Sequence, residues 1–282
     1  MTWQTLVFIP IATSAFGFAF YRLLILFRIM KSVGGKDARL NEIPARLITT
    51  LINVFGQKAV LKDKKPGLMH AVIFWGFIII SFGTLEQFLT TIHPAWTFEF
   101  VGRAPYAILL FAQDFFTAAV LLAVIYGFYR RLILRPPHLT LSKDAIYILI
   151  FTATLMGSIF LMNAFHILAI HPWFENALPF SKMFSTLLAP VGFSESTAAG
   201  LSTLFKWVHM LIVMGFTMYI PGSKHLHIIA AGPNTFFKTL TRQKPMKPIS
   251  FEDETVTQYG ASKITDLSWK DTLDLYSCTE CG

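Results

Sequence analysis

The chain has 282 residues, of which 54% are hydrophobic and 14% are charged, and its formal net charge is +8. This composition excludes an ordinary water-soluble domain, in which about 25% of residues are charged. The positive charge requires no nucleic acid, because basic loops beside an anionic lipid leaflet account for it. The composition therefore indicates a membrane protein.

Five apolar runs are long enough to cross a hydrocarbon layer of about 30 Å, which takes about 20 helical residues. The first run lacks the basic start and the cleavage site of a secretory signal, so we expect it to stay as a helix. The sequence thus predicts an all-α fold, with a five-helix transmembrane bundle over residues 1–221. The runs cover residues 3–27, 67–91, 105–129, 145–170 and 201–220.

Basic residues gather in two of the four connections between these runs. Residues 31–66 hold eight lysines and arginines and residues 130–143 hold four, whereas the other two connections hold only Arg103 and Lys182. Basic loops stay on the cytoplasmic side of a membrane. We therefore predict a protein of the cell inner (cytoplasmic) membrane, with its N-terminus outside and its C-terminus in the cytoplasm.

The apolar runs stop after residue 221, and the tail has a different character. Residues 222–272 include the stretch RQKPMKPISFEDE and are predicted to be a cytoplasmic linker. Residues 273–282 end in CTECG and hold both cysteines of the chain, Cys278 and Cys281. This spacing opens the ferredoxin pattern C-x-x-C-x-x-C-x-x-x-C-P, so it predicts the start of a truncated [4Fe-4S] domain. A redox dithiol or a zinc half-site is the alternative.

Three of the eight histidines lie within apolar runs: His70, His166 and His209. A polar ring inside a bilayer is costly unless it is paired, and a functional role is the default interpretation. A hydrogen bond to a neighbouring helix is the alternative. His93 and His171 each precede a proline near a tryptophan, which is typical of anchors at the membrane surface.

Two stacked haems would explain the histidine spacing. His209 and His227 are 18 residues apart, which on an unbroken helix places them on one face and about 27 Å apart. His70 lies at the depth of His227, so these two form the predicted inner pair of ligands, with His225 as the alternative to His227. His209 is the predicted outer ligand, and it needs a partner.

His166 is the best available partner for His209, and His93 is the fallback. Basic residues near the ends of the apolar runs are candidates to pair with haem propionates, or they only extend toward the membrane surface. They are Arg22, Arg28, Lys206 and Lys224.

The histidine pattern resembles the cytochrome b gamma subunit of respiratory nitrate reductase. The stretch YIPGSKHLHIIAAGPNTFF followed by DLYSCTECG is similar to a branch in which this cytochrome is fused to a heterodisulfide-reductase-like iron–sulfur part. Members of that branch include enzymes proposed to pass electrons from electron-transfer flavoprotein to menaquinone. The family has a second histidine ten residues after the first, and Ile80 occupies that position here. The resemblance thus implies the inner haem b, and the chain holds one haem or two.

Together these features predict a b-type cytochrome that relays electrons between menaquinone or ubiquinone and an iron–sulfur domain in the same longer chain. Electron-transfer flavoprotein is a possible soluble partner. Glu86 and Asp114 are the acids that stand out inside the apolar runs, and each either accepts a quinol proton or makes a polar contact within the bundle. The alternatives are a haem-free membrane anchor for the iron–sulfur domain and a transporter, which would need broken helices near the membrane centre.

Overall fold

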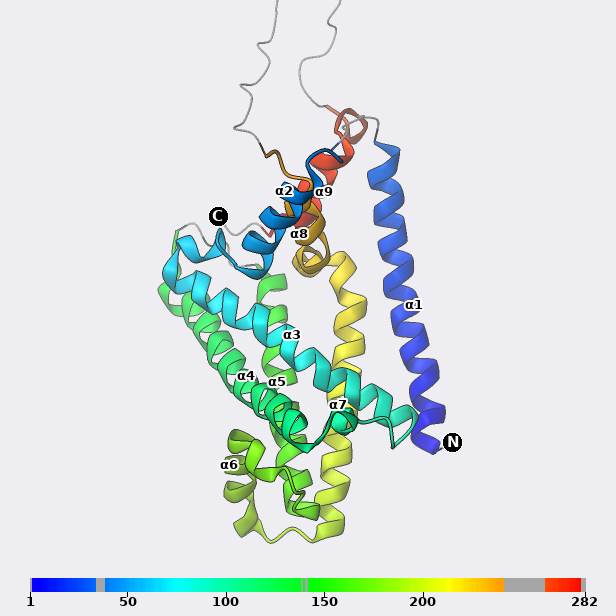
Figure 1. Ribbon diagram of the computed structural model, residues 1–282, viewed down its shortest axis with the longest axis vertical. Coiled ribbons are helices and arrows are strands. Elements are labelled where there is room, and N and C mark those ends of the chain that lie inside the picture. The colour runs from blue at the N-terminus through cyan, green and yellow to red at the C-terminus, as the bar shows by residue number, and fades with distance from the viewer. Residues whose placement is uncertain (1, 34–38, 138, 140–141, 241–261, 280–282) are drawn as a thin grey trace, which may run out of the picture.

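The computed structural model describes residues 2–33, 39–137, 139, 142–240 and 262–279, and in these residues the protein is built from helices without a strand. Figure 1 shows long helices running between two ends of the molecule. The short helices α2, α8 and α9 gather at one end, called here the α8 end, and α6 lies at the opposite end, the α6 end. The all-α prediction is confirmed for the described residues.

The five expected membrane spans are present as five helices that are long and apolar enough to cross a bilayer. Each extends beyond its apolar run, because a helix continues into polar residues that leave the hydrocarbon layer. The spans are α1 (Trp3–Ser32), α3 (Lys64–Ile92), α4 (Arg103–Tyr129, extended by the π-turn η4 to Leu134), α5 (Lys143–Ile170) and α7 (Glu195–Tyr219).

Shorter helices fill the connections. At the α8 end, α2 (Ile43–Thr50) continues into the π-turn η1 (Leu51–Phe55), followed by η2 (Val60–Lys62). After α7 come η7 (Ile220–Gly222), η8 (Lys224–Leu226) and α8 (His227–Phe236), and later η9 (Ile264–Asp266) and α9 (Trp269–Ser277). At the α6 end lie η3 (Phe98–Val101), η5 (Glu175–Ala177), α6 (Pro179–Leu188) and η6 (Ala189–Val191).

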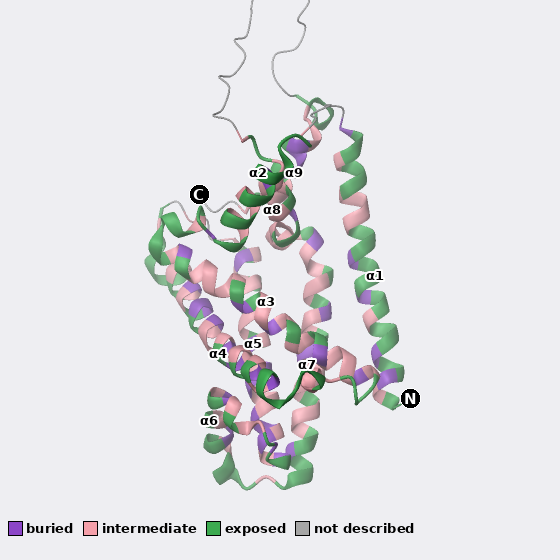
Figure 2. Cartoon of the chain, viewed as in Figure 1, coloured by how far each residue is buried: buried purple, intermediate pink, exposed green. Residues whose placement is uncertain are grey.

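The bundle is apolar on the outside as well as inside. Helices α5 and α7 pack along each other, α3 packs on α4, and α1 lies against α7 and α3. Large apolar side chains face outward along the spans, with Ile108 70% and Leu122 67% exposed, and Figure 2 shows these outer faces as mostly exposed. Lipid chains are a suitable environment for such surfaces, whereas water is not.

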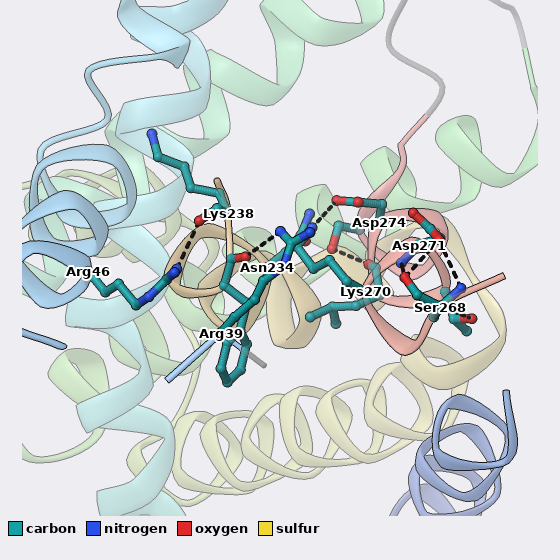
Figure 3. A network of polar contacts seen from close by, with 12 residues as sticks. Arg39, Arg46, Asn234, Lys238, Ser268, Lys270, Asp271 and Asp274 are labelled. Carbon is teal, nitrogen blue, oxygen red and sulfur yellow. Dashed lines mark hydrogen bonds and ion pairs between the residues drawn. The ribbon is translucent and has the colours of Figure 1, made fainter. Parts of the chain in front are cut away.

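The predicted linker, residues 222–272, contains folded elements. Helix α8 lies within it and α9 begins in it, while residues 241–261 lie outside the described residues. Figure 3 shows how α8 and α9 are held. Buried Arg46 of α2 donates to the carbonyl oxygens of Phe236 (3.0 Å) and Lys238 (2.8 Å), which close the C-terminal end of α8.

Helix α9 is docked by an unusually buried lysine. The Nζ of Lys270, 4% exposed, donates to Asn234 of α8 at 2.6 Å and to Asp274 of α9 at 2.5 Å. The Tyr276 hydroxyl donates to the Leu26 carbonyl of α1 at 3.2 Å. These contacts join the tail of the chain to α8 and α1.

Candidate functional site

His70 and His227 face one another at the α8 end of the bundle. Their ring centroids are 6.4 Å apart and the ring planes are inclined at 45°. His70 lies in the second turn of α3, and His227 is the first residue of α8. The helix through residues 206–229 is not continuous, because α7 ends at Tyr219 and two 3₁₀ turns precede α8. The position of His227 is therefore set by these turns and not by the helical periodicity of α7.

The hydrogen bonds of Gln57 determine which nitrogen of His70 carries the proton. The Gln57 amide nitrogen donates to the Val54 carbonyl at 2.5 Å, so its oxygen points to His70 Nδ1 at 2.9 Å. An amide oxygen only accepts, so Nδ1 carries the proton and Nε2 keeps its lone pair. Gln57 is 4% exposed and adopts a left-handed conformation with φ 51°, which turns the chain back toward His70.

The same arrangement holds His227. Its Nδ1 lies 2.8 Å from the carbonyl oxygen of Lys224, which only accepts, so Nδ1 donates and Nε2 keeps its lone pair. The Lys224 amide in turn donates to the Asp144 carboxylate at 3.0 Å, and the Tyr219 hydroxyl donates to the other oxygen of the same carboxylate. Asp144, in the first turn of α5, thus fixes the turn that positions His227.

The spacing of the two rings is one that two histidines holding a single metal ion could have. With metal–nitrogen bonds of about 2.0 Å and about 1.2 Å from nitrogen to ring centre, the centroids would lie about 6.4 Å apart. Ligating histidines nearly always donate their other ring N–H to a carboxylate or carbonyl oxygen, as both rings do here. Haem needs only two such side chains, since the porphyrin supplies four nitrogens. In the described part of the chain no three His, Cys, Asp or Glu side chains cluster as ligands of a metal ion.

His225 lies on the other side of His227 and packs against α7. Its ring centroid is 5.0 Å from that of Phe216 and 5.4 Å from that of His227. Burial is the main reason that the pKa of His225 is lowered to about 4, and the neighbouring His227 lowers it further. Of the two candidate ligands after α7, His227 is the one whose ring faces His70.

His209, predicted as an outer haem ligand, is 1% exposed and has both ring nitrogens in hydrogen bonds. The Ser158 hydroxyl donates to the Leu155 carbonyl at 2.7 Å, so it accepts from His209 Nδ1 at 3.0 Å. Nε2 then accepts from the Thr84 hydroxyl at 3.1 Å. In this arrangement His209 joins α3, α5 and α7, and haem binding there would require Thr84 to release Nε2.

The structure does not bring the proposed partners of His209 to it. The His166 ring stacks on Phe174 with centroids 6.2 Å apart. His93 contacts Trp96 at the far end of α3, with 5.5 Å between ring centroids. Thr84 of α3 is the residue that contacts His209 Nε2 from that helix.

Both acids singled out in the sequence make contacts that close the α6 end. Asp114 of α4 accepts from the backbone amides of Phe180 (2.7 Å) and Ser181 (3.2 Å) and from the Ser181 hydroxyl, all in the first turn of α6. Glu86 of α3 accepts from the Phe98 amide at 2.7 Å. These bonds are those of a polar contact within the bundle, which was one of the two expected roles.

Helices α3 and α7 also hold buried polar side chains that the sequence analysis did not name, Gln87 and Trp207. Lys206 donates to the Thr90 hydroxyl at 3.4 Å, and the buried Oε1 of Gln87 and Nε1 of Trp207 have no hydrogen-bond partner among the described residues. Lys206 is also the charged neighbour of His166. The signal that could have found Gln87 is the occurrence of a polar amide within an apolar run.

The remaining predicted residues that the structure describes belong to α1 and to the segments beside α8 and α9. Lys224 is three residues before His227, and Arg22 and Arg28 are exposed on α1. Cys278 directly follows α9 and is exposed with a free thiol, and Cys281 lies outside the described residues. Lys224 is thus the basic candidate nearest in the chain to the His70–His227 pair.

The chain is similar in sequence to two curated oxidoreductases. It is 35% identical over 252 residues to the probable iron-sulfur-binding oxidoreductase FadF of Bacillus subtilis, covering 89% of this chain and 35% of that protein. It is 26% identical over 290 residues to the EtfAB:quinone oxidoreductase of Syntrophomonas wolfei, covering 99% of this chain and 39% of that protein. No family model and no solved structure matches the chain.

The chain thus spans between a third and two fifths of the length of the two relatives it matches. Both relatives are oxidoreductases by name, which supports the resemblance to an iron–sulfur oxidoreductase. The nitrate reductase part of the resemblance stays a prediction.

Proposed function

We propose that this chain is a membrane-bound b-type cytochrome that relays electrons between a quinone and an iron–sulfur domain, with one haem b held between His70 and His227. The observation that carries the proposal is the shared tautomer of the two rings. Each Nδ1 donates to an oxygen, at Gln57 and at Lys224, so each Nε2 is left as a ligand. One metal ion bound by both Nε2 atoms would account for two histidines that are prepared in this way and lie 6.4 Å apart between ring centroids.

A haem with two histidine ligands supplies a one-electron carrier with no coordination site for substrate. Groups of the chain itself would orient the two histidine ligands by accepting hydrogen bonds from their Nδ1 atoms. The Gln57 oxygen and the Lys224 carbonyl keep the Nδ1 protons and set the ring orientations, and such contacts raise the basicity of the ligating nitrogen. Lys224 is the proposed partner of a haem propionate. These roles suit electron transfer and not chemistry at the iron.

The iron–sulfur partner is proposed from the tail of the chain and from the relatives. Cys278 and Cys281 would be the first two ligands of a [4Fe-4S] cluster completed by residues beyond this chain. Helix α9 ends beside Cys278 and docks on α8, which begins with His227. The α8 end, with the basic connections, is proposed to face the cytoplasm.

The quinone and the soluble partner are proposed from the name of one relative, the EtfAB:quinone oxidoreductase. Menaquinone or ubiquinone would exchange electrons with the haem, and electron-transfer flavoprotein would exchange them with the iron–sulfur domain. The transporter alternative has less support, because α3, α4, α5 and α7 run as continuous helices through their apolar centres.

The proposal is tested by adding the water-soluble quinol menadiol to the purified oxidised chain and recording the visible spectrum. We expect the absorption band of a reduced b haem to appear, and we expect His227→Ala to show no such band with either menadiol or dithionite. A wild-type band that dithionite produces and menadiol does not would refute the quinone link. A wild type with no band under either reductant would leave the haem-free anchor as the better description.

A further inference from the structure

A cavity of about 300 Å³ opens at the α8 end, between the short helices and the start of α3. One wall comes from α2 and η1, another from the turn that leads to α3, and the third from Lys238, two residues after the end of α8. Seven residues line it: Thr49, Ile52, Asn53, Lys58, Ala59, Lys62 and Lys238. Three of them are lysines and none is acidic, so the cavity is suited to an anion.

The backbone of this cavity is fixed by buried groups. The left-handed residue Gln57 reverses the chain, so that the Lys58 amide donates back to the Ile52 carbonyl at 3.3 Å. The Leu61 amide donates to the Gln57 carbonyl at 2.9 Å, which closes the following turn. On the other side, Arg46 holds the carbonyl oxygen of Lys238 at 2.8 Å. The three lysines are thus attached to a built framework and do not merely lie on one exposed helix.

Within the described part of the chain, the ammonium groups of Lys58, Lys62 and Lys238 have no carboxylate or hydrogen-bond partner. Lys58 and Lys62 come from the segment before α3 and Lys238 from the segment after α8, so three positive charges border one cavity and repel one another. A bound anion would offset this repulsion and accept hydrogen bonds from all three groups.

Exposed apolar side chains lie beside the cavity, which favours an anion that carries acyl chains. Ile52 lines the cavity and is 44% exposed, and the adjacent side chains of Ile48 (57%), Leu51 (56%) and Phe55 (44%) are also exposed. The span α3 begins only two residues after Lys62. A charged cavity beside an exposed apolar strip at the end of a span is the arrangement of a site at the membrane surface.

We propose that this cavity binds the phosphate headgroup of an anionic phospholipid, whose acyl chains lie on the apolar strip of α2 and η1. Lys58, Lys62 and Lys238 hold the phosphate oxygens. The turn that forms the cavity is the one that places Gln57 against His70, so the lipid would also brace that turn. The inference does not depend on haem.

The test uses the full chain in neutral detergent, with phosphatidylglycerol or phosphatidylcholine added, and counts retained lipids by native mass spectrometry. The variant Lys58→Gln/Lys62→Gln/Lys238→Gln is compared with the control Lys31→Gln/Lys65→Gln/Lys143→Gln, which removes the same charge from lysines outside the cavity. We expect the wild type and the control to retain more phosphatidylglycerol than phosphatidylcholine. In the cavity variant, the amount of retained phosphatidylglycerol should fall at least about tenfold.

Equal loss in both triple variants would overturn the proposal, because it would reflect net charge alone. Equal retention of the two lipids by the wild type would also overturn it, and this readout needs no variant to fold. Inorganic phosphate distinguishes the two sources of the same chemistry. If millimolar phosphate alone raises the thermal midpoint as much as phosphatidylglycerol does, the cavity binds a free anion and not a lipid.

Discussion

Gln57 and His70 are joined by a hydrogen bond of 2.9 Å between Oε1 and Nδ1, and this bond fixes the tautomer of the histidine. The amide is itself held by the Val54 carbonyl, so its orientation is set by the fold. His227 Nδ1 likewise donates to the Lys224 carbonyl oxygen, which fixes the same tautomer. Two histidines from distant parts of the chain therefore each carry the proton on Nδ1 and keep Nε2 unprotonated, as the proposed shared metal requires.

Gln57→Leu removes the acceptor behind His70 and is expected to weaken haem retention by about 10- to 100-fold, the usual effect of losing such a partner. Gln57→Glu is the matched control, because a carboxylate still accepts from Nδ1. The measurement is haem loss to apomyoglobin, followed by absorbance. Because Gln57→Glu loses the donor to the Val54 carbonyl, the deciding comparison is with the wild type: if Gln57→Leu lost haem no faster than the wild type, the acceptor would have no such role.

His209→Ala is expected to lower stability by about 2–4 kcal/mol, because it leaves a cavity and unpairs the Thr84 and Ser158 hydroxyls. His209→Gln, which can still donate and accept, should cost less. The thermal midpoint of both variants in detergent reports this, together with the haem content. Loss of haem from His209→Ala at unchanged stability would restore His209 as a ligand.

Asp114→Leu is expected to destabilise the α6 end by about 1–3 kcal/mol, since the amides of Phe180 and Ser181 lose their acceptor. Asp114→Asn keeps one acceptor oxygen and should cost less. Thermal unfolding and menadiol oxidation are measured on the same samples. If Asp114→Asn stopped quinol oxidation while the protein kept its full stability, the carboxyl would be a proton acceptor instead.

Lys270→Met removes the ammonium that joins Asn234 to Asp274, and it is expected to release α9 from α8. Amide hydrogen exchange in residues 269–277 should rise at least about tenfold, while exchange in α5 stays unchanged. Lys270→Arg is the control that retains the charge. Unchanged exchange in the methionine variant would mean that Trp269 and Tyr276 hold the helix without Lys270.

The five spans could be predicted from the sequence because a bilayer imposes a single rule on length and polarity, and each apolar run became a helix. The packing of α8 and α9 in the tail could not be predicted from the sequence. Helices α8 and α9 are short, and buried Arg46 and Lys270 hold them through contacts over 190 and 36 residues of sequence. Such contacts leave no periodic pattern in the tail.

The candidate site was predictable in its residue types and not in its geometry. The spacing of 18 residues indicated His209 and His227 as ligands on one helical face, but the helix between them ends at Tyr219. The partners that define the site are a glutamine in a left-handed turn and a backbone carbonyl, neither of which has a sequence signal. Thr84 opposite His209 is equally ordinary in the sequence, so only the fold shows that His209 is fully hydrogen-bonded.

The most direct test of the central claim is the haem content per chain, measured as the pyridine haemochrome of the purified wild type, His70→Ala and His209→Ala. The His70–His227 site predicts one b haem in the wild type, none in His70→Ala and one in His209→Ala. A wild type without haem, or a His70→Ala variant that keeps its haem, would contradict the claim. Two haems in the wild type with one lost in His209→Ala would contradict the single site.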